Sequence, residues 1–159
     1  MQVSRAADLG QQQAIAALPA EVRDLARHVL LGAFNRRGRP IGFHHAPGGV
    51  CPPGRRIDQV VERFPDGTYR AHVSFYHPTR GWVRKADPHT MFPDTWSSED
   101  VMRAGIDAYR SHGDAWLARV RNGTRWRGRH RGVEIRGICS SPPPRPSTFY
   151  PPGEEGRGR

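Results

Sequence analysis

The sequence has almost no lysine. Of its 25 lysine and arginine residues, 24 are arginine and only one, Lys85, is lysine. A coding bias toward arginine explains most of this imbalance, but it would also convert a lysine that is needed only for its charge. Lysine carries a compact ammonium with an adjustable pKa, whereas arginine carries a broad planar group that stays charged. Two interpretations of Lys85 stay open here: chance, or a task that arginine does not perform.

Long apolar runs and cysteines are also scarce. No stretch approaches the ~20 apolar residues of a membrane-spanning helix, and residues 1–10 lack the apolar core of a signal peptide. We therefore expect no membrane association, and either a cytosolic protein or a toxin-like module that is exported by other means. Cys51 and Cys139 lack the spacing of a zinc site. They can pair in an oxidising compartment, but isolated cysteines are more often free thiols.

The composition that remains is basic and rich in turn formers. The formal net charge is +10 and the isoelectric point is about 11.1, which favours a polyanionic partner. Nucleic acid is the first candidate, and an acidic protein or an anionic membrane is the second. Apolar residues make up 36%, and 18 glycines and 15 prolines predict long loops. A chain of 159 residues is most simply one domain.

The hydrophobic periodicity predicts an α+β fold with N-terminal helices packed on two antiparallel β-sheets. Apolar residues recur every three or four positions over residues 11–31, with a second helix starting after Pro19 and a stop at Gly32. Ser97 followed by Asp100 predicts a capped helix from Ser98 to about Tyr109. Alternation with period two predicts strands at 57–64, 69–76, 82–85, 124–130 and 133–139, and a short extended segment at 147–150.

Histidines and the single lysine are the candidates for chemistry. His28 ends the first helical region, and His44 and His45 lie where a loop meets its next segment. Two imidazoles with pKa values near neutrality can act as general base and general acid. A nearby lysine can hold the extra charge of a pentacoordinate phosphate. RNA transesterification needs this combination and no metal. We expect the other histidines at the surface: His72, His77, His89, His112 and His130.

Five short motifs occur in an order that is typical of one family. They are residues 28–32 (HVLLG), 41–44 (IGFH), 67–73 (GTYRAHV), Lys85 with 90–97 (TMFPDTWS), and 147–151 (STFYP). In these motifs the chain resembles the bacterial EndoU endoribonucleases, relatives of the eukaryotic and coronaviral uridylate-specific endoribonucleases. The resemblance covers residues 27–152 as a nuclease domain. Residues 1–26 form a helical lead-in, and we expect residues 153–159 to be a disordered tail.

The resemblance implies roles for individual residues. His28, His44 and Lys85 correspond to the catalytic residues, with His45 as an adjacent rival of His44 that would contact the substrate. Thr148 and Tyr150 correspond to the pair that contacts uracil and ribose, and Thr90 holds the strand near Lys85 or touches the phosphate. Many relatives carry Gly-Gly-His where this chain has Gly42, Phe43 and His44. Which histidine is the base stays open.

Arginines alternate along the strand predicted at 124–130. Arg125, Arg127, Arg129 and Arg131 are separated by Trp126, Gly128 and His130. One face of the strand is therefore a row of guanidinium groups, and Arg127 and Arg129 are candidates for tracking RNA phosphates. A merely solvated exterior is the alternative.

Together these features predict a metal-independent endoribonuclease. The resemblance implies that it cleaves single-stranded RNA with a preference for uridine, for example in a tRNA loop, and leaves a 2′,3′-cyclic phosphate. No cofactor is required by this mechanism, although Mn²⁺ assists some relatives. The resemblance also implies a monomeric bacterial toxin that is delivered into the cytoplasm of a target cell and neutralised by an acidic cognate immunity protein. The alternative is a non-catalytic RNA-binding module on the same scaffold.

Overall fold

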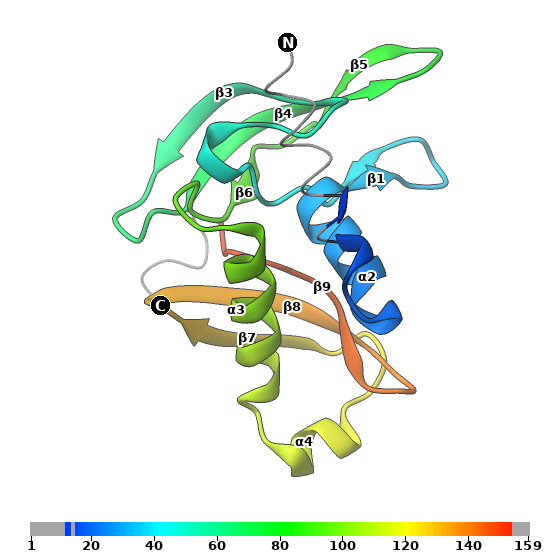
Figure 1. The fold of residues 1–159 in the computed structure, drawn as a ribbon, viewed down its shortest axis with the longest axis vertical. Helices are drawn as coiled ribbons and strands as arrows, with labels where there is room; N and C mark the ends of the chain where they lie inside the picture. Colours follow the sequence, from blue (N-terminus) through cyan, green and yellow to red (C-terminus); the bar gives the residue numbers. More distant parts are fainter. Residues whose placement is uncertain (1–11, 14, 154–159) are drawn as a thin grey trace.

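The computed structural model describes residues 12–13 and 15–153, and it is an α+β fold with three antiparallel sheets (Figure 1). The helical elements are α2 (Ala20–Ala26), the π-helical turn η1 (Arg27–Leu31), the 3₁₀ turn η2 (Pro47–Gly49), α3 (Ser98–Arg110) and α4 (Asp114–Arg119). The strands are β1 (Ala33–Phe34), β2 (Pro40–Ile41), β3 (Arg55–Arg63), β4 (Tyr69–His77), β5 (Gly81–Arg84), β6 (His89–Met91), β7 (Arg125–His130), β8 (Val133–Ser140) and β9 (Arg145–Tyr150). In this part of the chain, no helix is long and apolar enough to cross a membrane.

Strand β4 organises a four-stranded sheet. It pairs with β3 along one edge. Its other edge is shared by β5, which pairs with residues 74–77, and by β6, which pairs with residues 69–71. The short connection between β5 and β6 spans residues 85–88. On its inner face the sheet buries a core with Tyr69, Val73 and Phe75 from β4, and Phe43 and Met91 from its neighbours.

The three-stranded sheet β7-β8-β9 packs against α3 (Figure 1). The predicted capping box at the start of α3 is confirmed, since Ser97 and Asp100 exchange side-chain hydrogen bonds with each other's backbone N–H groups. Gly105 in α3 and Gly128 in β7 permit this close approach, because a Cβ at Gly105 would collide with the Phe149 ring. The second core lies between these elements and α2.

The sequence predictions agree with this architecture except in its smaller parts. The start of α2 after Pro19 and the stop at Gly32, where φ is 69°, are confirmed. A third sheet, the hairpin β1-β2, was not expected, and neither were β6 and α4. Strand β9 begins at Arg145, two residues before the extended segment that was predicted at 147–150. Both cysteines are free thiols. Residues 1–11 and 14 of the predicted lead-in and residues 154–159 of the predicted tail lie outside the described residues.

Candidate active site

The backbones of the two histidine segments are bonded to each other. Because η1 is a π-helix, Gly32 donates to the Arg27 carbonyl, five residues back, at 2.8 Å. The carbonyls of the next two residues accept from outside the helix instead. Phe43 N–H donates to His28 at 3.0 Å, and His44 N–H donates to Val29 at 2.6 Å. The π-helical turn thus fixes the position of His28 relative to His44.

The residues before His44 adopt conformations that permit this approach. Gly42 has φ 76°, and a Cβ there would collide with the His28 carbonyl. Phe43 has φ 65°, which costs a non-glycine residue about 1–2 kcal/mol. Burial of its ring against Phe75, at 6.0 Å between centroids, offsets this cost. At the C-terminal end of η1, the Arg55 side chain from β3 donates hydrogen bonds to the Leu31 and Gly32 carbonyls.

His44 is held at three points. Besides its N–H, its carbonyl accepts from Phe92 N–H at 2.7 Å, and its Nδ1 lies 2.8 Å from the Thr90 carbonyl. Since a carbonyl only accepts, Nδ1 carries the proton, and Nε2 is the unprotonated nitrogen. Burial lowers the pKa of His44 to about 3, against the raising effect of the Thr90 carbonyl. At neutral pH His44 is therefore an uncharged imidazole with a fixed tautomer.

Lys85 and His89 lie at the two ends of the connection between β5 and β6. Lys85 N–H donates to the Val73 carbonyl, which extends the pairing of β5, and its ammonium donates to His89 Nδ1 at 2.6 Å. Burial lowers the pKa of Lys85 to about 8, although Asp87 acts in the opposite direction. Lys85 is thus a half-buried ammonium with a pKa close to neutrality.

His89 is the residue that the sequence analysis misplaced. The prediction that it lies at the surface is wrong: its side chain is 5% exposed and its ring stacks on His44, with centroids 4.1 Å apart. Burial holds its pKa well below the usual value. The alternation of His89 with the buried Met91 in β6 is the signal that could have indicated an inward side chain.

His28 and Tyr150 complete the cluster. His28 is half-buried, and both burial and the charge of Lys85 lower its pKa. Its own charge in turn lowers the pKa of His44. The Tyr150 ring stacks on His44 from β9, with centroids 5.7 Å apart and an interplanar angle of 28°. Four segments that are distant in sequence thus bring three histidines, a lysine and a tyrosine together.

His45 faces away from this cluster. It is fully buried, and its Nε2 lies 2.8 Å from the Trp96 carbonyl. Burial lowers its pKa to about 4, and that carbonyl partly opposes the shift. The structure leaves the ring without access to a substrate, contrary to the prediction, and gives it a structural contact to the loop before α3. Of the two adjacent histidines, His44 is the one at the cluster.

The remaining candidates lie on β6 and on one face of the three-stranded sheet. Thr90 is in β6, and its carbonyl holds His44. Thr148 and Tyr150 share the face of β9 opposite to Phe149, which packs against α3. By register, Tyr150 lies beside Arg136, which lies beside Arg127. The outer face of the three-stranded sheet therefore carries Thr148, Tyr150, Arg125, Arg127, Arg129 and Arg136.

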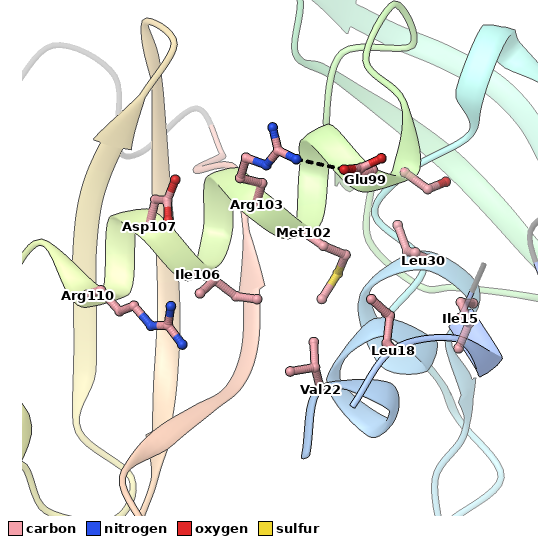
Figure 2. A pocket seen from close by; sticks show the side chains of 11 residues that line it. Ile15, Leu18, Val22, Leu30, Glu99, Met102, Arg103, Ile106, Asp107 and Arg110 are labelled. Carbon is pink, nitrogen blue, oxygen red and sulfur yellow. Dashed lines mark hydrogen bonds and ion pairs between the residues drawn. The ribbon is translucent and has the colours of Figure 1, made fainter. Parts of the chain in front are cut away.

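A cavity elsewhere in the molecule carries no group of this kind. It lies between α3 and the N-terminal helical residues, where Met102 and Ile106 face Val22 and Leu18 (Figure 2). Arg103 and Glu99 form an ion pair at 2.7 Å on its rim. Among the residues that the structure describes, no histidine or lysine lines it. Over the described residues, no group of three or more histidine, cysteine, aspartate or glutamate side chains is arranged to hold a metal ion.

A comparison with known families supports what the motifs indicated. The model of the bacterial EndoU nuclease family matches residues 23–153. The chain belongs to this family. As an EndoU nuclease, it is expected to bind nucleic acid, and the α+β architecture with antiparallel sheets is consistent with the family's fold. No curated protein and no solved structure matches the chain.

Proposed function

We propose that this EndoU nuclease is a metal-independent endoribonuclease that cleaves single-stranded RNA after uridine. The observation that carries the proposal is the cluster itself: besides burial, the charge of Lys85 lowers the pKa values of His28 and His44, His28 lowers that of His44, and Tyr150 stacks on His44. Two imidazoles and an ammonium are the groups that transesterification of a phosphodiester requires.

In the proposed reaction His44 is the general base. Its Nε2 takes the proton of the uridine 2′-hydroxyl, because Nδ1 is bonded to the Thr90 carbonyl. The O2′ atom then bonds to phosphorus, and the bond from phosphorus to O5′ of the next nucleotide breaks. His28 in its protonated form donates to O5′, and the Lys85 ammonium stabilises the pentacoordinate phosphate. The products are a 2′,3′-cyclic phosphate and a 5′-hydroxyl, with one proton taken up and one released.

The three-stranded sheet supplies the binding surface in this proposal. Tyr150 stacks on the uridine, as aromatic side chains do with unpaired nucleotides. The Thr148 hydroxyl reads the uracil edge, since it can both donate and accept. Arg127 and Arg129 are exposed on the same face and contact phosphates. His89 touches no reacting atom; it positions Lys85 and His44.

The biological role that we propose is that of a monomeric toxin acting on the RNA of a target cell. The net charge of +10 fits both an RNA substrate and an acidic immunity protein that would cover the site. The competing proposal is a non-catalytic RNA-binding module, which the basic outer face of the three-stranded sheet favours by itself. The two differ in whether His28, His44 and Lys85 are needed for more than binding.

A cleavage assay in EDTA separates these proposals. The substrate is an oligonucleotide with a single uridine, and mass spectrometry identifies the product end. We expect a 2′,3′-cyclic phosphate after the uridine, and losses of about 10²-fold or more for His28→Ala and His44→Ala. Arg119→Gln, an exposed change on α4, is the matched control. RNA binding without cleavage across pH 5–8 would sink the enzyme proposal and leave the binding module.

The pH profile tests the assignment of base and acid. His28 must be protonated in the free enzyme, and its pKa lies below 6.5, so kcat/KM should fall as the pH rises above 6.5. A further fall is expected near pH 8, where Lys85 loses its charge. A profile that rises steadily from pH 6 to pH 8 would contradict His28 as the acid.

A further inference from the structure

A basic groove opens beside Lys85, on the side of the molecule that carries the four-stranded sheet. It lies between the β1-β2 hairpin, the turn after β4, and strand β5 with the residues that follow it. Five of its ten lining residues are cationic, and Asp87 is the single acidic one. The cations are Arg37, Arg39, Arg80, Arg84 and Lys85.

The walls of this groove are fixed by contacts of their own. Arg80 donates to the Gly38 carbonyl at 2.6 Å, and its guanidinium lies 5.4 Å from the centre of the Phe34 ring. The Phe34 ring in turn packs edge-on against His77 at the end of β4. These contacts hold the hairpin against the turn between β4 and β5, so the groove does not depend on a ligand for its shape.

Within the part of the chain that the structure describes, the side chains of Arg37 and Arg39 make no hydrogen bond or ion pair. The backbone N–H groups of Arg37 and Arg39 donate to Asn35 Oδ1 at 2.9 and 3.0 Å, which builds the loop between β1 and β2. Both residues are exposed. The loop conformation therefore rests on Asn35, while the guanidinium groups are available to an anion.

We propose that this groove binds the RNA phosphates that follow the scissile phosphate on its 3′ side. The inference rests on the proposed function, in which the uridine lies on Tyr150 and the scissile phosphate at Lys85. Tyr150 belongs to the three-stranded sheet, which contributes no residue to the groove. Lys85 lines the groove. An RNA strand that passes from Tyr150 over Lys85 and continues in the same direction enters the groove. The part of the RNA in the groove is then the part on the 3′ side of the scissile phosphate, which carries the leaving O5′.

Binding of uncleavable oligonucleotides tests the direction. Each probe carries one 2′-deoxyuridine, which lacks the attacking hydroxyl, and five adenosines are added either on its 3′ side or on its 5′ side. We expect Arg37→Gln/Arg39→Gln to weaken the 3′-extended probe about tenfold at low salt, and to reduce the slope of log K against log salt by about two. Affinity for the 5′-extended probe should stay within about twofold, since its added phosphates lie on the other side of Lys85.

The control is the charge-matched Arg119→Gln/Arg121→Gln. Arg119 ends α4 and Arg121 follows it by two residues, and α4 lies at the opposite end of the molecule from β5 (Figure 1). Equal losses for both probes, or none for either, would overturn the inference and assign the arginines to general charge or to another acidic partner. Cleavage of the matching ribo-oligonucleotide is measured separately. A wild type that does not cut it rejects the proposed function, whereas a wild type that cuts it while both probes bind the variant equally rejects only the groove.

Discussion

In the proposed function, the four-stranded and three-stranded sheets contribute different kinds of side chain to the same site. Next to the four-stranded sheet, Lys85 is half-buried, His89 is buried, and the two side chains are hydrogen-bonded to each other. The His89 ring stacks on His44, and the charge of Lys85 lowers the pKa of His44. On the outer face of the three-stranded sheet, Arg127 and Arg129 are exposed, and their positions follow from strand alternation alone. Burial is what shifts the pKa values of the first group.

This difference has a physical reason. Proton transfer needs groups with displaced pKa values and fixed tautomers, and both require a desolvated site with directed hydrogen bonds. Binding a phosphate backbone needs only accessible charge. We therefore expect substitutions beside the four-stranded sheet to change the rate of cleavage, and substitutions on the outer face of the three-stranded sheet to change the affinity for RNA.

The strongest test of this division is Lys85→Arg, which keeps the charge. The broad guanidinium cannot replace an ammonium that donates to His89 Nδ1 at 2.6 Å and still faces the phosphate. We expect kcat to fall about 10²-fold or more, as for loss of one group that stabilises the transition state, with KM within a few-fold. Single-turnover cleavage measures this. If the variant keeps a third of the activity, Lys85 is needed only for its positive charge.

The next test concerns His89. Its Nδ1 accepts from a partly desolvated ammonium, a bond to a charged group worth about 1.5–3 kcal/mol. His89→Leu removes the acceptor, so kcat should fall about 10- to 100-fold, and the alkaline limb of the pH profile should move to lower pH. His89→Gln offers an amide oxygen and should restore part of both. If the two variants differ only in thermal stability, His89 has a structural role and no influence on Lys85.

The sequence alone predicted the surface features and the main elements, but not how the site is built. Alternation along β7 indicated the arginine face, and Ser97 with Asp100 indicated the start of α3. The roles of His28, His44 and Lys85 came from motifs, and their convergence came only from the fold. The inward orientation of His89 was missed, because β6 has only three residues and its alternation with Met91 is therefore a short signal.

Acidification should destabilise the folded protein through its buried histidines. Burial lowers the pKa of His44 to about 3 and that of His45 to about 4, and holds the pKa of His89 well below 6.5. The unfolded chain therefore takes up protons below about pH 6.5 that the folded state rejects. The free energy of unfolding should fall as the pH drops from 6.5, by up to about 1.4 kcal/mol per pH unit for each histidine.

Urea denaturation at pH 7.5, 6.5 and 5.5 measures this effect. His45→Asn removes one of these three histidines and leaves the cluster at His44 unchanged. The slope of the free energy of unfolding against pH should then fall by the contribution of one histidine. A stability that is constant from pH 7.5 to pH 5.5 would mean that these imidazoles are protonated without cost, and would remove the contrast between the two regions.

The smallest effect is expected on the outer face of the three-stranded sheet. Arg127→Gln/Arg129→Gln removes two exposed charges on the face that also carries Tyr150. Each lost phosphate contact should raise KM a few-fold and lower the salt dependence of binding by about one unit of slope. The value of kcat should stay within about twofold, because neither guanidinium reaches the reacting atoms. A loss of kcat comparable to that of Lys85→Arg would mean that the outer face takes part in the chemistry, and the division between a buried catalytic region and an exposed binding region would fail.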